Sequence, residues 1–104
     1  MNVTDVLENL AALPTDGVVV VGLNHGAVTP ASEAEVLRLD EHEQAQPIHS
    51  VVSQKTPGKH YLLEVDLIRE VVEAFREMRG RMPTAQEALE AIAFYVENDA
   101  FITD

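Results

Sequence analysis

The residues best placed to do chemistry are a polar pair that follows an unbroken run of valines. Asn24 and His25 lie a few residues after the run Val18-Val19-Val20-Val21 and directly before Gly26. Folds with a buried strand often place a binding loop where that strand ends. Asn24 and His25, in a loop over residues 22–29, are therefore the candidate ligand-binding residues. Asn-His-Gly is also ordinary turn chemistry, and the loop carries neither of the glycine-rich phosphate-binding motifs.

The four histidines do not have the spacing of a metal site. No HxxxH or HExxH pattern occurs, and no cysteine is available to complete a tetrahedral zinc site. His42 lies in the acidic run 40–43, but adjacent side chains of a helix or strand do not converge on one ion. His49 and His60 can share a ligand only across a hairpin formed by residues 48–65. The sequence predicts no catalytic residue, no metal site and no cofactor.

The acids of the chain are separated from its bases. Asp and Glu number 18 against 7 Lys and Arg, which gives a net charge of −11. Residues 1–37 and 82–104 contain no Lys or Arg, and residues 38–81 contain all of them. A nucleic acid or an anionic membrane needs a positive surface, so neither is an expected direct partner. A helix-turn-helix DNA reader is disfavoured for the same reason, since residues 84–98 carry acids and no base.

Glu87, Glu90 and Glu97 form the candidate interaction surface, on the helix expected over residues 84–98. Glu87 and Glu90 share a face, and Glu97 lies two turns beyond Glu90. The leading hypothesis is a small acidic non-enzymatic module, a regulator or adaptor, that binds a basic protein partner. One alternative is a nucleic-acid mimic that inhibits a DNA- or RNA-binding protein, since phosphates present one charge per about 1.7 Å of duplex axis. The other is a small-ligand binder or enzyme that uses the 22–29 loop.

Length and composition indicate one globular domain. A chain of 104 residues with 46% apolar residues is expected to fold as a single domain over residues 1–104. No apolar run approaches the roughly 20 residues that span a bilayer, and the N-terminus does not resemble a signal peptide. The chain has no cysteine, which fits a reducing compartment. We therefore expect a cytoplasmic protein without a membrane partner.

The elements that must position these residues follow from apolar spacing and from turn residues. The valine run predicts a central strand over residues 17–23, because it is not interrupted by polar residues. Residues 30–45 fit a helix and a strand equally well. Residues 48–53 and 60–65 are expected to pair as a hairpin around Pro57-Gly58.

Helices are expected at both ends of the chain. Apolar residues at helical spacing predict one helix over residues 5–13 and two over residues 67–79 and 84–98. In the last helix, Ala88, Leu89, Ile92, Ala93 and Val96 are expected to face inward. The apolar residues Phe101 and Ile102 are expected to pack back on the domain.

Together these elements predict an α+β fold with a three- or four-stranded, mostly antiparallel sheet. The N-terminal helix and the C-terminal helical hairpin should cover one face of the sheet. If the other face stays uncovered, it is available for self-association as a homodimer.

Overall fold

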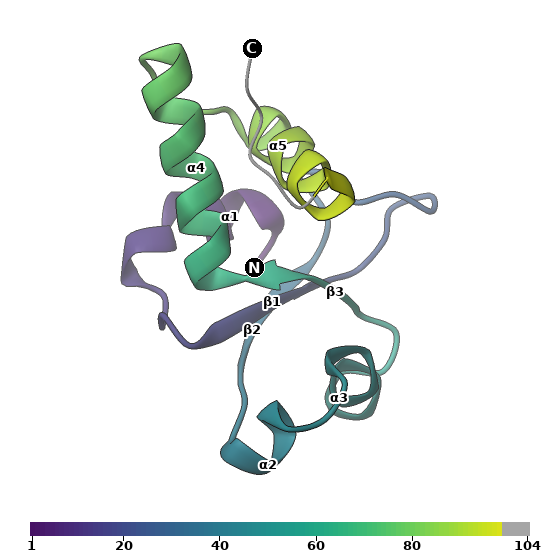
Figure 1. Ribbon diagram of the computed structural model, residues 1–104. Helices are drawn as coiled ribbons and strands as arrows, with labels where there is room; N and C mark the ends of the chain where they lie inside the picture. Colours follow the sequence, from purple (N-terminus) through teal and green to yellow (C-terminus); the bar gives the residue numbers. More distant parts are fainter. Residues whose placement is uncertain (99–104) are drawn as a thin grey trace.

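The computed structural model describes residues 1–98, which form a three-stranded antiparallel sheet with helices on both faces (Figure 1). The strands are β1 (Gly17–Val21), β2 (Ala34–Arg38) and β3 (His60–Glu64), in the order β2-β1-β3. Every residue of β1 is buried, which confirms that the valine run is the centre of the sheet. The predicted α+β fold is thereby confirmed.

One face of the sheet is covered by the helices from both ends of the chain. These are α1 (Val3–Glu8), the short 3-10 helix η1 (Leu10–Ala12), α4 (Val65–Arg79) and α5 (Ala85–Asn98). Val19 and Val21 of β1 point into this larger core, whose buried members include Val6, Ile68, Val71 and Ile92. The predicted placement of the terminal helices on one face is confirmed.

The helical boundaries follow from their capping residues. Asn2 caps α1 in a reciprocal arrangement with Asp5, and the helix then gives way to η1, so the helix expected over residues 5–13 is two shorter elements. Gly80 ends α4 in the left-handed region with φ of 73°. A capping box starts α5: Thr84 Oγ1 accepts a hydrogen bond from the Glu87 amide at 3.2 Å, and the Thr84 amide donates to the Glu87 carboxylate at 3.0 Å.

The other face of the sheet is covered by a helix, in a segment that was predicted to be a strand. Residues Ile48–Lys55 are α3, so the prediction of a strand over residues 48–53, and of a hairpin with β3, is wrong. Val51 and Val52 are neighbours and both are only 2% exposed, whereas a strand with one covered face would bury alternate residues. Ile48, Val51 and Val52 follow the i, i+3, i+4 spacing of a helix. A second core joins Val52 to Val18 and Val20 of β1.

Because α3 packs against this face, the uncovered sheet surface that suggested a homodimer is not present in residues 1–98. Residues 30–45, which fitted a helix and a strand equally well, contain β2 and a short helix, α2 (Glu41–Gln44), capped by Asp40. Phe101 and Ile102 lie outside the described residues. Within residues 1–98 no helix is both long and apolar enough to cross a membrane.

Candidate functional site

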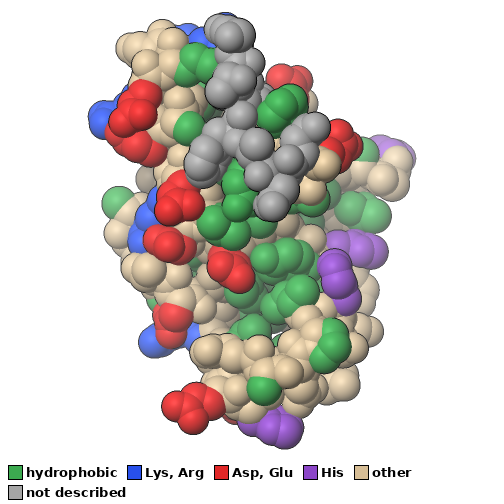
Figure 2. Space-filling view, in the orientation of Figure 1, with side chains coloured by type: hydrophobic (Ala, Val, Ile, Leu, Met, Phe, Trp, Pro, Cys, Tyr) green, Lys and Arg blue, Asp and Glu red, His purple; other side chains and the backbone are tan. Residues whose placement is uncertain are grey.

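An apolar groove of about 380 Å³ lies where α5, β3 and the loop after β1 meet. Its α5 wall is formed by Leu89, Ile92, Ala93 and Val96. The facing wall is formed by Val28, Tyr61 and Leu62, and Glu97 completes the lining. Figure 1 shows the loop beside the C-terminal end of α5, and Figure 2 shows hydrophobic side chains gathered on this face of the molecule.

The groove exists because α5 carries more apolar residues than the core can accept. Residues 91–96 are uninterrupted apolar residues, and a helix that packs on one side cannot bury all of them. Ala88, Leu89 and Ile92 are buried as expected, but Ala93 and Val96 are exposed, contrary to the prediction that they face inward. Val96 is 59% exposed. The long apolar run was the signal in the sequence that would have revealed this surface.

The loop wall is held by a tight turn that contains both candidate ligand-binding residues. Asn24 and Ala27 exchange backbone hydrogen bonds of 2.8 and 3.1 Å, and His25 and Gly26 both have positive φ, as in turns of type I′. The Asn24 side-chain amide donates to Thr29 Oγ1 at 3.0 Å. Asn24 therefore stabilises the loop, and His25 is exposed at its tip. Their assignment as ligand-binding residues stays a prediction.

The three glutamates of the predicted interaction surface differ in their surroundings. Glu87 accepts two hydrogen bonds from the Arg81 guanidinium, at 2.8 and 2.6 Å, and these lower its pKa to about 2. Glu97 lines the groove, Glu90 lies on the same side of α5 two turns earlier, and neither forms an ion pair within residues 1–98. We call these two carboxylates the groove rim: Glu97 at the groove itself and Glu90 farther along the same side of α5, both unneutralised by an ion pair within residues 1–98.

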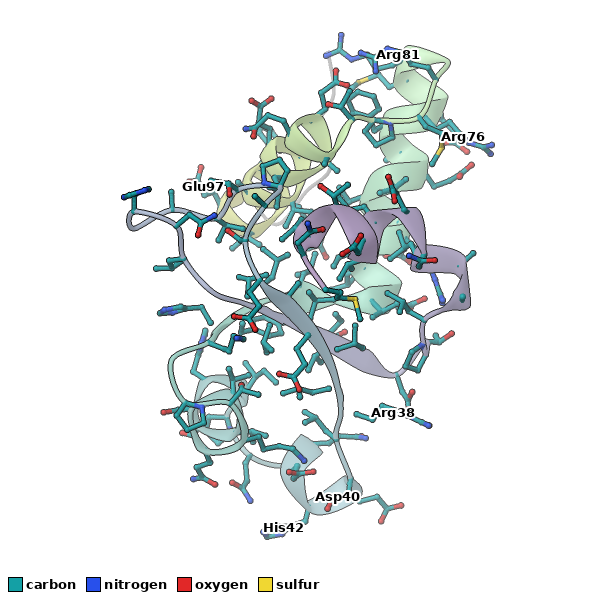
Figure 3. All side chains as sticks on the ribbon, turned by 180° about the vertical axis from the view of Figure 1, so that it is seen from behind. Arg38, Asp40, His42, Arg76, Arg81 and Glu97 are labelled. Atoms are coloured by element: carbon teal, nitrogen blue, oxygen red, sulfur yellow. The ribbon has the colours of Figure 1, made fainter. Side chains whose placement is uncertain are left out.

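Figure 3 shows Glu97 at the end of α5, remote from Arg76 and Arg81 at the opposite end of the helical hairpin. About 18 Å of helix separate residue 85 from Glu97, because an α-helix rises 1.5 Å per residue. The bases of the hairpin therefore do not neutralise the groove rim.

Most bases elsewhere are engaged inside the domain. Ion pairs join Arg38 to Asp16, Lys55 to Glu43, Lys59 to Glu33 and Arg76 to Glu73. The Arg69 guanidinium donates to the carbonyl oxygens of Leu10 and Leu13. Because the 7 bases can neutralise only some of the 18 acids, a surplus of carboxylates remains.

A second row of carboxylates runs along the exposed face of α4. The α4 stripe consists of Asp66, Glu70, Glu73 and Glu77, all exposed and spaced by four, three and four residues. This spacing puts them on one face of the helix. The stripe was missed from the sequence because residues 38–81 are nearly neutral in total, whereas the structure pairs their bases away from most of these acids.

A second hollow, of about 390 Å³, lies between the sheet and the segment that joins β2 to α3. Tyr61 and Glu64 line it from β3, and burial, with the nearby Glu64 carboxylate, raises the pKa of the Tyr61 hydroxyl. Two other lining acids, Asp16 and Glu43, already form ion pairs with Arg38 and Lys55.

The histidines do not assemble into a site in the structure. His49 packs edge-on against Tyr61, with ring centroids 5.9 Å apart, and the hairpin that would have set it opposite His60 is absent. His42 lies on α2 with its neighbours Asp40 and Glu43 engaged in the cap of that helix. Residues 1–98 contain no group of three His, Asp or Glu side chains placed to hold a metal ion.

A family model described as a domain of unknown function, DUF7716, matches residues 1–103. The chain belongs to this family. No curated protein and no solved structure matches the chain. The match runs from α1 through α5, so both walls of the groove fall within the DUF7716 domain.

Proposed function

We propose that this DUF7716 domain is a non-enzymatic interaction module, a regulator or adaptor, that binds a basic segment of another protein. The observation that carries the proposal is the separation of charge at the surface. Arg38, Lys55, Lys59, Arg76 and Arg81 form ion pairs inside the domain, while carboxylates remain in rows on α4 and α5. Rows of like charge steer an oppositely charged partner and raise its association rate.

Location and assembly form part of the same proposal. We place the protein in the cytoplasm, because a cysteine-free chain needs no oxidising compartment to fold. A homodimer stays a prediction, to be tested by light scattering over a range of protein concentrations. Since α3 covers the second sheet face, a dimer would have to use another surface.

The proposal is tested by capture of partners on the immobilised domain at low and high salt. In the stripe variant, Asp66→Asn, Glu70→Gln and Glu77→Gln remove exposed charges of α4. In a charge-matched control, Glu8→Gln, Glu35→Gln and Glu41→Gln remove exposed charges elsewhere. We expect basic partners to bind the wild type and the control at low salt, and to be lost from the stripe variant and at high salt.

Recovery of the same proteins on the wild type, the stripe variant and the control would contradict the proposal, since binding would not depend on where the charge lies. Recovery of no protein in any condition would contradict it as well.

A nucleic-acid mimic is the alternative that the α4 stripe favours. The stripe adds carboxylates to Glu90 and Glu97, but Glu87 is compensated by Arg81, and neighbours on a helix face are about 5–6 Å apart, sparser than duplex phosphates. In this alternative the captured partner would be a nucleic-acid-binding protein, and duplex DNA would displace it from the domain. A partner that DNA does not displace would exclude the mimic.

A further inference from the structure

We infer that the groove between α5, β3 and the loop after β1 is the docking site for one amphipathic α-helix of the partner, with apolar residues on one face and Lys or Arg beside them. The inference rests on the proposed function, because it names the site and the chemistry of the segment that binds there.

The apolar floor of the groove supplies the first argument. Leu89 and Ile92 give it a base that is fixed in the core, and Val96 stays 59% exposed beside them. An exposed apolar surface set in an otherwise charged domain is typical of a binding surface. Burial of such a surface by a partner gains about 25 cal/mol per Å² of apolar area.

The charge of the rim supplies the second argument. Glu97 lines the groove, and Glu90 lies on the same side of α5 two turns earlier. No Lys or Arg is among the lining residues in the described part of the chain. A partner whose apolar face enters the groove is therefore complementary when its flanking residues are cationic.

Both walls are held in place before any partner arrives. On the loop wall, the Thr29 amide donates to the Oγ of Ser32, which is fully buried, at 2.8 Å. The carbonyl oxygens of Pro30 and Ser32 accept from the amides of Thr4 and Val3 in α1. The opposite wall belongs to α5, where Ile92 is 1% exposed. A preformed groove does not have to be ordered on binding, which favours affinity.

A helix fits this site better than an added strand. β3 is an edge strand of the sheet, so an extended segment would have to pair along it. The register between β1 and β3 shifts between Val19 and Val20, opposite Tyr61 to Leu63, and such a bulge disrupts the regular edge that an added strand needs. The α5 wall, in contrast, offers apolar residues at helical spacing for ridges-into-grooves packing.

The test uses a fluorescein-labelled peptide of Leu and Lys, about 18 residues long so that it forms a helix on a surface, with Leu at helical spacing. Its affinity for the full chain is measured by fluorescence anisotropy. A second peptide has the same Lys residues and Ser in place of Leu. Backbone amide shifts in the NMR spectrum of the protein locate the bound peptide.

Three variants distinguish the contribution of the apolar groove to peptide affinity from the contribution of the acidic charge. In the groove variant, Ala93→Gln and Val96→Ser leave the net charge unchanged at exposed positions, so the fold is kept. In the rim variant, Glu90→Gln and Glu97→Gln remove two acids. Its matched control, Glu8→Gln and Glu35→Gln, removes two exposed acids elsewhere. We expect the groove and rim variants to weaken binding by about tenfold and the control by less than about twofold.

Two results would overturn the docking site while leaving the proposed function intact. One is equal weakening by the rim variant and its control with no effect of the groove variant, which means attraction by net charge alone. The other is a set of shifted amides centred on α4. A dimer that the groove variant dissociates would assign the groove to a second copy of the chain and also overturn the inference. Tighter binding of the Ser peptide than of the Leu peptide would exclude an apolar anchor.

Discussion

Arg69 has hydrogen-bond partners that its position in the sequence does not predict. The helical spacing of α4 puts it on the polar face, yet its guanidinium turns back toward the N-terminal segment. Nη2 donates to the carbonyl oxygens of Leu13 and Leu10 at 2.6 and 2.9 Å, and Nη1 donates to Thr15 Oγ1 at 2.8 Å. One side chain of α4 therefore binds the carbonyl groups around the end of η1, where the Leu10 oxygen also accepts from the Leu13 amide at 3.3 Å.

Replacement of Arg69 by Met should lower the free energy of unfolding by about 1–3 kcal/mol, because partly buried carbonyl groups lose a charged donor. Arg69→Lys should recover only part of the loss, since an ammonium group does not reproduce the guanidinium fork. The measurement is urea denaturation followed by circular dichroism.

The control for this prediction is Arg38→Met. Arg38 is 69% exposed in its side chain and forms one ion pair, with Asp16 at 3.2 Å. Such pairs contribute about 0–1 kcal/mol. If both substitutions lower the free energy of unfolding equally, the contacts of Arg69 with η1 contribute no more to stability than an exposed ion pair does.

Glu87 makes stability depend on pH. Arg81 holds the pKa of its carboxyl at about 2 in the folded protein, below the ordinary value of 4.5. Its contribution to stability is therefore complete above the ordinary pKa and is lost as the pH falls from about 4.5 toward 2. We expect Glu87→Gln to destabilise the protein at pH 6 and the difference from wild type to shrink as the pH falls through that window.

Thermal unfolding of wild type and Glu87→Gln between pH 2 and pH 6 measures this effect. Arg81→Gln should remove the same pH dependence, and the double variant should add little, because both substitutions break one ion pair. Parallel curves for wild type and Glu87→Gln across the window would show that the pair does not couple to folding.

At the scale of elements, a helix or strand was predicted correctly where the spacing of its apolar residues fitted only one type of secondary structure. The helices α4 and α5 were predicted from their apolar spacing, and the structure adds two local signals that agree with it, Gly80 at the end of α4 and the capping box at the start of α5. The segment Ile48–Lys55 was misassigned because β-branched residues favour strands, whereas tertiary packing against Val18 and Val20 selected the helix. The spacing of Ile48, Val51 and Val52, at i, i+3 and i+4, was the discriminating signal.

The candidate site was predictable only in part, and for a physical reason. Glu87, Glu90 and Glu97 could be proposed from the sequence because their spacing on one helix is local, and of the three only Glu97 lines the groove. The groove joins Val28, Leu62 and Val96, which are far apart in the sequence, so no local pattern reports it. The net charge summed over residues 38–81 is close to zero, and for this reason the α4 stripe was not predicted.

Exposed Ser53 provides a test of α3, because helix and strand rank its substitutions in opposite order. In a helix, Ser53→Ala should raise the free energy of unfolding by about 0.5 kcal/mol, and Ser53→Thr should not, because Ala is the strongest helix former and Thr a weak one. In a strand, Thr would be the stabilising residue. Urea denaturation of both variants decides between them, and stabilisation by Thr alone would contradict the helix.

At the scale of the whole molecule, the net charge of −11 acts against the compact state. The internal ion pairs remove part of the repulsion, but the α4 stripe and the groove rim keep carboxylates in rows. A surface that carries unneutralised acid where binding is proposed is less stable than a neutral one would be. This trade of stability for attraction is expected of an electrostatic binding surface.

The melting temperature should therefore rise with NaCl concentration up to about 0.5 M, because salt shortens the Debye length from about 10 Å at 0.1 M and screens the repulsion between carboxylates. Glu70→Gln with Glu77→Gln should raise the melting temperature at low salt and flatten its salt dependence, since both acids are exposed members of the α4 stripe. The control, Glu73→Gln, should do neither, because Glu73 pairs with Arg76 at 2.7 Å and its loss leaves a base without its acid. Scanning calorimetry across a salt series measures all three proteins. A melting temperature that falls with salt in the wild type would mean that attractive pairs outweigh repulsion, and the rows of acid would then impose no cost on the fold.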